Sequence, residues 1–158
     1  MRACVFTQFR DQQECVRRLV TQELQLKVYM LHGGTEVKYR EKRIREFQSL
    51  AHPGPAVFII TIRAGSVGVT LTAATHVFLM EPCILPACEV QAAGRIHRLG
   101  QTKPVGVTKL VYRESCESNI VALHNKIKEK GGGYIQGDSL SYGAAKMLVY
   151  GSEALIQG

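Results

Sequence analysis

The sequence predicts an α/β fold in which a parallel sheet carries helices on both faces. Short β-prone runs alternate with segments of helical apolar spacing along most of the chain. Two of these runs are continuously apolar, which is typical of strands covered on both faces. Strands that alternate with helices indicate a parallel, doubly wound sheet.

Each element of the first half follows from its pattern and its turn residues. The expected elements are a strand at Ala3–Thr7, a helix with its apolar residues between Cys15 and Leu24, a strand at Lys27–Leu31, and a charged helix that packs Ile44 and Phe47 on one side. A glycine turn, His32-Gly33-Gly34, separates the last two elements.

The second half continues the alternation. Its expected elements are strands at Ala56–Ile60, His76–Met80 and Val105–Tyr112, a helix at Ala87–Ile96 after Pro86, and a helix at Ser118–Lys130 with Ile120, Val121, Leu123, His124 and Ile127 inward. We therefore expect residues 1–130 to form one lobe. We expect 131–158 to be a Gly-rich tail or linker, partly disordered, with a weak helical pattern at Ala144–Val149.

Composition limits the class of protein. Of the 158 residues, 46% are hydrophobic and 21% charged, which predicts a folded soluble domain of ordinary size. The net charge of +7 favours a polyanionic partner. Five cysteines without a CxxC pair indicate a reducing intracellular compartment and no metal site. No apolar run approaches the length of a membrane span, so we expect neither secretion nor membrane insertion.

The chemistry is expected at the carboxyl ends of the strands, after Thr7, Leu31, Thr61 and Met80. The segment from Thr61 to Thr72 is rich in small residues, which let a phosphate or ribose approach backbone N–H groups closely. Such a turn is weak support for a phosphate site when it stands alone.

Two arginines strengthen the prediction of a phosphate site. Arg95 and Arg98 are three residues apart, which would place them on one helical face. Guanidinium groups stay charged and bind phosphate oxygens bidentately, so they can stabilise charge on a transferring phosphoryl group. The alternative is that both arginines pair with acidic neighbours on a solvated helix.

Four segments in order resemble helicase motifs IV, IVa, V and VI of Swi/Snf motors: Val5–Phe9, Leu31–Thr35, Thr61–Ala74 and Gln91–Val105. The resemblance covers roughly residues 3–130, and the string Arg95–Pro104 is particular to this family. His76–Pro82 and Ile84–Pro86 are most similar to the RING-bearing branch linked to post-replication repair. The resemblance implies a three-layer, RecA-like lobe.

The resemblance also implies roles for individual residues at an ATP site. Arg95 and Arg98 would reach the γ-phosphate of ATP held by a first lobe, and Gln91 would support them as the third catalytic residue. Gly65, Gly68 and Thr70 would lie near the nucleotide, although the family usually has Asn where this chain has Thr70.

The nucleic-acid contacts that the resemblance implies are to the backbone of double-stranded DNA. The residues concerned are Thr7, Gln8, Gly33, Gly34, Thr61 and Arg63. The alternative for Thr7 and Gln8 is ordinary strand-end capping. For Gly33 and Gly34 it is a tight turn that needs a positive φ.

The chain contains no GxxxxGK[ST] phosphate loop and no Asp-Glu pair after a strand to hold Mg²⁺. We therefore expect the ATP phosphates and Mg²⁺ to be held by a first lobe in the same polypeptide, and this chain alone to be inactive. The resemblance implies a nuclear DNA translocase that remodels chromatin or repairs DNA. Chromatin and ubiquitin-pathway proteins are further candidate partners.

Two other readings stay open at this point. One is a lobe that binds nucleic acid or protein without ATP turnover. The other is a mononucleotide-binding α/β enzyme unrelated to helicases.

Overall fold

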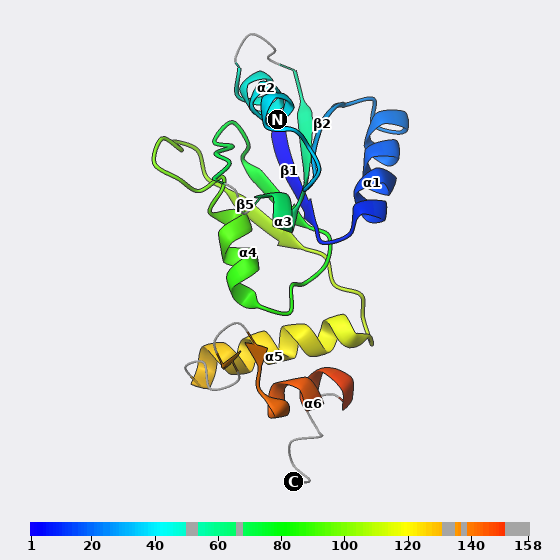
Figure 1. The fold of residues 1–158 in the computed structure, drawn as a ribbon, viewed down its shortest axis with the longest axis vertical. Coiled ribbons are helices and arrows are strands. Elements are labelled where there is room, and N and C mark those ends of the chain that lie inside the picture. The colour runs from blue at the N-terminus through cyan, green and yellow to red at the C-terminus, as the bar shows by residue number, and fades with distance from the viewer. Residues whose placement is uncertain (50–53, 66–67, 131–134, 137–138, 151–158) are drawn as a thin grey trace. The chain divides into compact units, whose positions relative to one another are not determined.

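The computed structural model describes residues 1–49, 54–65, 68–130, 135–136 and 139–150. The chain forms two compact units (Figure 1). The first consists of Met1–Met80 with Ala87–Leu110, and the second of Glu81–Pro86 with Val111–Gly158. No helix among the described residues is both long enough and apolar enough to cross a membrane.

The first unit is built on a five-stranded sheet in the order β2-β3-β1-β4-β5, with every pair of neighbours parallel. The strands are β1 (Arg2–Thr7), β2 (Lys27–Leu31), β3 (Ala56–Thr61), β4 (His76–Leu79) and β5 (Gly106–Lys109). Thr7 lies opposite Thr61, and Leu31 opposite Ile60. The carboxyl ends of the three strands therefore meet at one edge, and the predicted fold class is confirmed.

Helices cover both faces of this sheet. The helix α1 (Arg10–Gln22) buries Val20 against Val5 and Ile59 on one face. The helices α2 (Val37–Gln48), α3 (Ile62–Gly65) and α4 (Pro86–Ala93) share the opposite face. There Phe47 meets Phe58 edge-on, with ring centroids 5.0 Å apart. Burying a side chain of this size contributes about 1.5–3 kcal/mol, so this face anchors α2.

Most boundaries differ from the prediction by one or two residues, and three differences are larger or add an element. The last strand, β5, is shorter than the predicted Val105–Tyr112. It is an edge strand whose residues are largely exposed, so the apolar pattern of the sequence overestimates the length that pairs with the sheet. The single-turn helix α3 lies where a loop was expected, and it buries Ala64. The helix α4 ends at Ala93 instead of Ile96 because the chain passes into tight turns, with the amides of Arg95 and Ile96 bonded three residues back.

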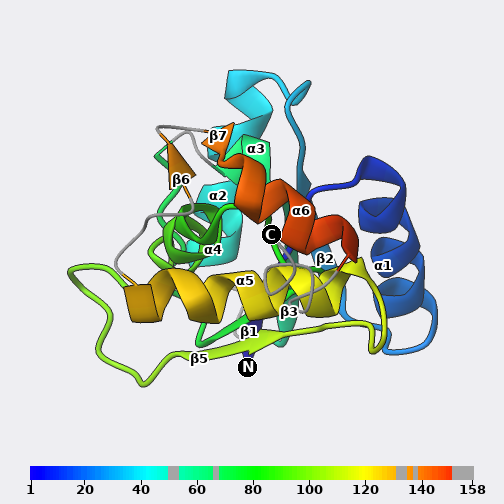
Figure 2. The ribbon, with the colours of Figure 1, turned by 90° about the horizontal axis from the view of Figure 1, so that it is seen from below.

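The second unit holds α5 (Cys116–Lys130), the short strands β6 (Ile135–Gln136) and β7 (Ser139–Leu140), and α6 (Tyr142–Tyr150). Figure 2 shows α5 and α6 side by side, and Leu123, Ala144 and Met147 form their shared core. The last predicted helix and the weak pattern at Ala144–Val149 are thus confirmed. The glycines at 131–133 and the end of the tail lie outside the described residues, and a domain boundary at residue 130 stays a prediction.

The cysteines are free, and they differ in exposure. Cys4 and Cys83 are buried, Cys88 is partly buried, and Cys15 and Cys116 are exposed. Burial raises the pKa of the Cys4 thiol far above its usual range, so this thiol is inert.

Candidate phosphate-binding site

The residues predicted to bind phosphate groups lie in the first unit, in two regions. One is the turn that follows α4, together with the loop at 68–75. The other is the edge of the sheet where β1, β2 and β3 end. We call the first region the arginine turn region and the second the strand-end region.

In the arginine turn region, Arg98 contacts Thr70 directly. The Nη1 of Arg98 donates to the Thr70 hydroxyl at 2.9 Å, and its Nε donates to the Gly94 carbonyl at 3.2 Å. A predicted catalytic residue and a predicted nucleotide-binding residue, 28 positions apart, are therefore brought together. The described hydrogen bonds of Arg98 go to neutral oxygens and leave its charge available to an anion.

The helical-face argument for the arginine pair is wrong, although the residues are close. Because α4 ends at Ala93, Arg95 and Arg98 lie in the turns beyond it. Ile96, between them, is fully buried and anchors the turn in the core. Burial first, and then the charge of Arg98, lowers the pKa of Arg95. Two guanidinium groups that repel each other in this way favour an anion placed between them.

Backbone and amide hydrogen bonds fix the arginine turn to the loop at 70–74. The Leu71 amide donates to the Arg95 carbonyl at 2.9 Å. The Gln101 side chain donates to the carbonyls of Thr72 at 3.0 Å and Ala74 at 2.9 Å. Gln48, at the end of α2, also holds this loop, because its Nε2 donates to the Thr72 hydroxyl at 3.1 Å. The two segments are therefore bonded at several points.

The other residues predicted for the ATP site have differing environments. Gln91 is exposed on α4. Gly68 has a φ of +52° and open space where a Cβ would project, so a side chain there would be strained by the backbone and not by crowding. Gly65 is the last residue of α3, and Ser66 lies outside the described residues.

In the strand-end region, Thr7 is buried. Its hydroxyl donates to Gln12 Oε1 at 2.7 Å and accepts from the Phe9 amide at 3.1 Å. This is the geometry of strand-end capping, with the hydroxyl turned into the protein. Thr61 lies beside it and is also buried. The exposed residues of the predicted DNA set are Gln8, Gly33, Gly34 and Arg63.

The turn after β2 closes on itself. The Thr35 amide donates to the His32 carbonyl at 2.9 Å, and the Gly34 amide donates to His32 Nδ1 at 3.2 Å. Among the described glycines, a positive φ occurs at Gly68 and Gly100, so the explanation of Gly33 and Gly34 by a positive φ is wrong. A Cβ at Gly33 would meet nothing within 4 Å, so the backbone there is open to approach by a ligand.

Positive charge surrounds this turn. Burial and the nearby charges of Arg10 and Arg43 lower the pKa of His32. A neutral imidazole is also what the hydrogen bond requires, because Nδ1 accepts from Gly34. Arg10 and Arg43 were absent from the predicted site, since their positions in the sequence do not indicate that they meet at His32.

A buried glutamine that the sequence pattern does not reveal joins β2 to β3 near their carboxyl ends. The Nε2 of Gln13, on α1, donates to the carbonyls of Leu31 at 2.8 Å and Ile59 at 3.0 Å. Gln13 is fully buried. Gln13 lies on the inner face of an amphipathic helix, where an apolar residue is expected. That position is the sequence feature that could have indicated a buried polar contact.

Comparison with known proteins identifies the family of this chain. The family model described as "Helicase conserved C-terminal domain" matches residues 1–100. The human helicase-like transcription factor is 39% identical over 103 residues, which are 65% of this chain and 10% of that protein. DNA repair protein RAD5 of Mycosarcoma maydis is 34% identical over 126 residues, covering 77% of this chain and 9% of that protein.

A solved structure extends the likeness to three dimensions. The C-terminal part of the Fun30 ATPase domain aligns with a TM-score of 0.70 and 28% identity, covering 93% of this chain and 46% of that one. The chain spans about a tenth of the length of the curated relatives cited above. It belongs to the helicase conserved C-terminal domain family and is similar to the corresponding lobes of Swi/Snf motors of the RING-bearing post-replication-repair branch.

Proposed function

We propose that this chain is the second motor lobe of an ATP-dependent DNA translocase that acts in chromatin remodelling or DNA repair in the nucleus. The first lobe, in the same polypeptide, would hold ATP and Mg²⁺. The observation that carries the proposal is the hydrogen bond between Arg98 and Thr70 beside Arg95, which brings together three of the residues predicted for the nucleotide.

Each residue of the junction has a definite task in this proposal. Arg95 and Arg98 act as arginine fingers, which stabilise the negative charge that spreads over the γ-phosphoryl group as water attacks and ADP departs. Thr70 orients Arg98 through its hydroxyl, and Gln91 supports the pair. Burial first, and then the charge of Arg98, lowers the pKa of Arg95. This supports the assignment, because an arriving anion would stabilise the charged form against both effects.

The strand-end region meets the DNA backbone in this proposal. Gln8, Gly33, Gly34 and Arg63 are exposed there, and Arg10 and Arg43 add charge close to His32. Such groups follow phosphates without reading bases. The burial of Thr7 and Thr61 supports a role for these two side chains in shaping the edge that carries the contacts.

The test replaces Arg95 or Arg98 with Ala or Lys in a two-lobe protein that includes the first lobe. An arginine finger acts mainly on the transition state, so DNA-stimulated kcat should fall on the order of 10³-fold while ATP affinity changes little. Lysine should rescue poorly because it lacks the planar fork. The matched control is Arg45→Ala, an exposed arginine of α2.

Near-normal turnover by folded Arg95→Ala and Arg98→Ala proteins would show that the arginines are not fingers. A two-lobe protein that binds DNA and has no turnover even with both arginines intact would instead favour a non-catalytic binding lobe.

A further inference from the structure

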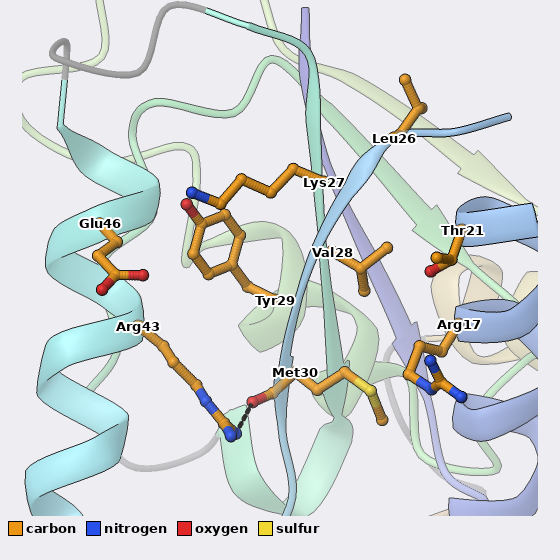
Figure 3. A pocket seen from close by; sticks show the side chains of 9 residues that line it. All are labelled: Arg17, Thr21, Leu26, Lys27, Val28, Tyr29, Met30, Arg43 and Glu46. Atoms are coloured by element: carbon orange, nitrogen blue, oxygen red, sulfur yellow. Dashed lines mark hydrogen bonds between the residues drawn. The ribbon is translucent and has the colours of Figure 1, made fainter.

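A groove of about 510 Å³ runs along the free edge of β2 (Figure 3). The helices α1 and α2 flank it on opposite sides and contribute Arg17 and Arg43 to its lining. The strand contributes the run Lys27–Met30. The groove is separate from the arginine turn region, and Arg43 is the residue of its lining that also adds charge to the strand-end region.

The strand offers unpaired backbone groups to this groove. Among the described strands, β2 pairs with β3 alone. On its outer side the Leu26 amide donates to the Val20 carbonyl at 3.2 Å, and the Met30 carbonyl accepts from Arg43 Nη1 at 2.7 Å. In a parallel strand, the amide and the carbonyl of one residue point to the same side, and every second residue points to that side. Val28 lies between Leu26 and Met30 in this alternation, so its amide and carbonyl also face outward.

Side chains give the groove an apolar wall and a positive rim. Val28 and Met30 pack with the core on the α1 face, and Lys27 lies over the ring of Tyr29 at 5.2 Å. The charged residues of the lining are Arg17, Lys27, Arg43 and Glu46. Arg17 donates two hydrogen bonds of 2.6 and 2.8 Å to Glu14, which neutralises it. Lys27 and Arg43 together outweigh the remaining carboxylate of Glu46, so the lining keeps an excess of one positive charge.

We propose that this groove binds an extended acidic peptide, which adds to the sheet as a strand beside β2. Its backbone would pair with Val28, and acidic side chains at alternate positions would meet Lys27 and Arg43. Arg43 covers the Met30 carbonyl in the free chain. On binding it exchanges that carbonyl for a carboxylate of the peptide, and the carbonyl is left to accept a peptide N–H.

An acidic peptide fits these features better than a DNA duplex does. A strand edge recessed between two helices presents hydrogen-bonding groups spaced to match another peptide backbone. The phosphates of a duplex lie on a convex surface and need exposed cations, whereas Arg43 is partly buried and bonded to the strand.

The test uses the full chain, labelled with ¹⁵N, and a fluorescent peptide of about eight residues in which Glu and Val alternate. Binding should shift the backbone amides of 26–31 and the side chain of Arg43. A peptide of the same sequence, N-methylated at alternate residues on the pairing edge, should bind at least about tenfold more weakly because it cannot complete the ladder.

Variants test the charged rim. Lys27→Gln and Arg43→Gln should each weaken peptide binding about tenfold, while Arg45→Gln on the exposed side of α2 should leave it unchanged. Melting curves verify that the variants fold. Three results would each overturn the proposal: equal binding of the N-methylated peptide, shifts confined to residues away from β2, or shifts at β2 that duplex DNA reproduces while displacing the peptide.

Discussion

Arg98 and Thr70 are joined by a hydrogen bond of 2.9 Å from guanidinium to hydroxyl, so the loop after α3 helps to orient an arginine of the turn after α4. This hydrogen bond orients the Arg98 guanidinium before a phosphate arrives. Orientation in advance lowers the cost of forming the transition state.

Thr70 is therefore expected to act on turnover through Arg98. In a two-lobe protein, Thr70→Val should lower kcat by about tenfold or more, because the guanidinium loses an oriented partner. Thr70→Asn should retain most of the activity, since its side-chain oxygen can accept the same bond. Steady-state ATPase assays with DNA measure the effect, and equal kcat for Thr70→Val and the parent would exclude this role.

Gln13 is expected to matter for stability and not for turnover. Gln13→Leu removes the side-chain donor to the carbonyls of Leu31 and Ile59 and should lower the free energy of unfolding by about 1–3 kcal/mol. Gln22→Leu, at an exposed position of the same helix, is the control. Urea unfolding followed by circular dichroism gives both values, and a change no larger than that of the control would contradict the assignment.

The isolated chain should bind duplex DNA without hydrolysing ATP. It lacks the phosphate loop and Mg²⁺ ligands, so ATPase activity should not exceed a buffer control with or without DNA. DNA affinity should fall steeply with salt, and Arg63→Gln should reduce the slope of log K against log salt by about one unit. Salt-insensitive binding, or turnover by the pure chain, would refute this prediction.

The His32 turn should lose stability in acid. The pKa of His32 in the folded state lies below the ordinary value of 6.5. Neutral His32 therefore contributes fully to the free energy of unfolding above pH 6.5. This contribution is lost as the pH falls through the lowered folded-state pKa. Protonation removes the acceptor of the Gly34 amide. Thermal melts from pH 8 to about pH 5 should show a smaller acid loss for His32→Gln than for the parent. The exposed His97→Gln variant should follow the parent curve.

The sequence predicted the sheet well because the interior strands leave an unbroken apolar signature. All six residues of Ala56–Thr61 are buried, as a strand covered on both faces requires. The edge strand β5 has mostly exposed residues, so its apolar pattern could not fix its ends. The arginine pair stays a predicted site, whereas its expected helical geometry is wrong because α4 gives way to turns before Arg95.

The glutamines escaped prediction for a different physical reason. Gln13, Gln48 and Gln101 donate mainly to oxygens far away in the sequence, such as the Ile59 carbonyl 46 residues from Gln13. A side-chain amide shows no periodicity that reveals a distant backbone partner. These contacts follow only once the topology has placed the strand ends beside one another.

The bond from the Leu71 amide to the Arg95 carbonyl, with Gln101 spanning the same two segments, has a mechanical consequence. Segments tied through their backbones move as one body, so Arg95 and Arg98 would approach a nucleotide by displacement of the whole lobe. Separate swings of the two side chains would have to break these ties. Spectroscopic labels on the loop at 70–74 and on the turn at 95–101 should therefore report the same amplitude and the same rate during an ATP cycle.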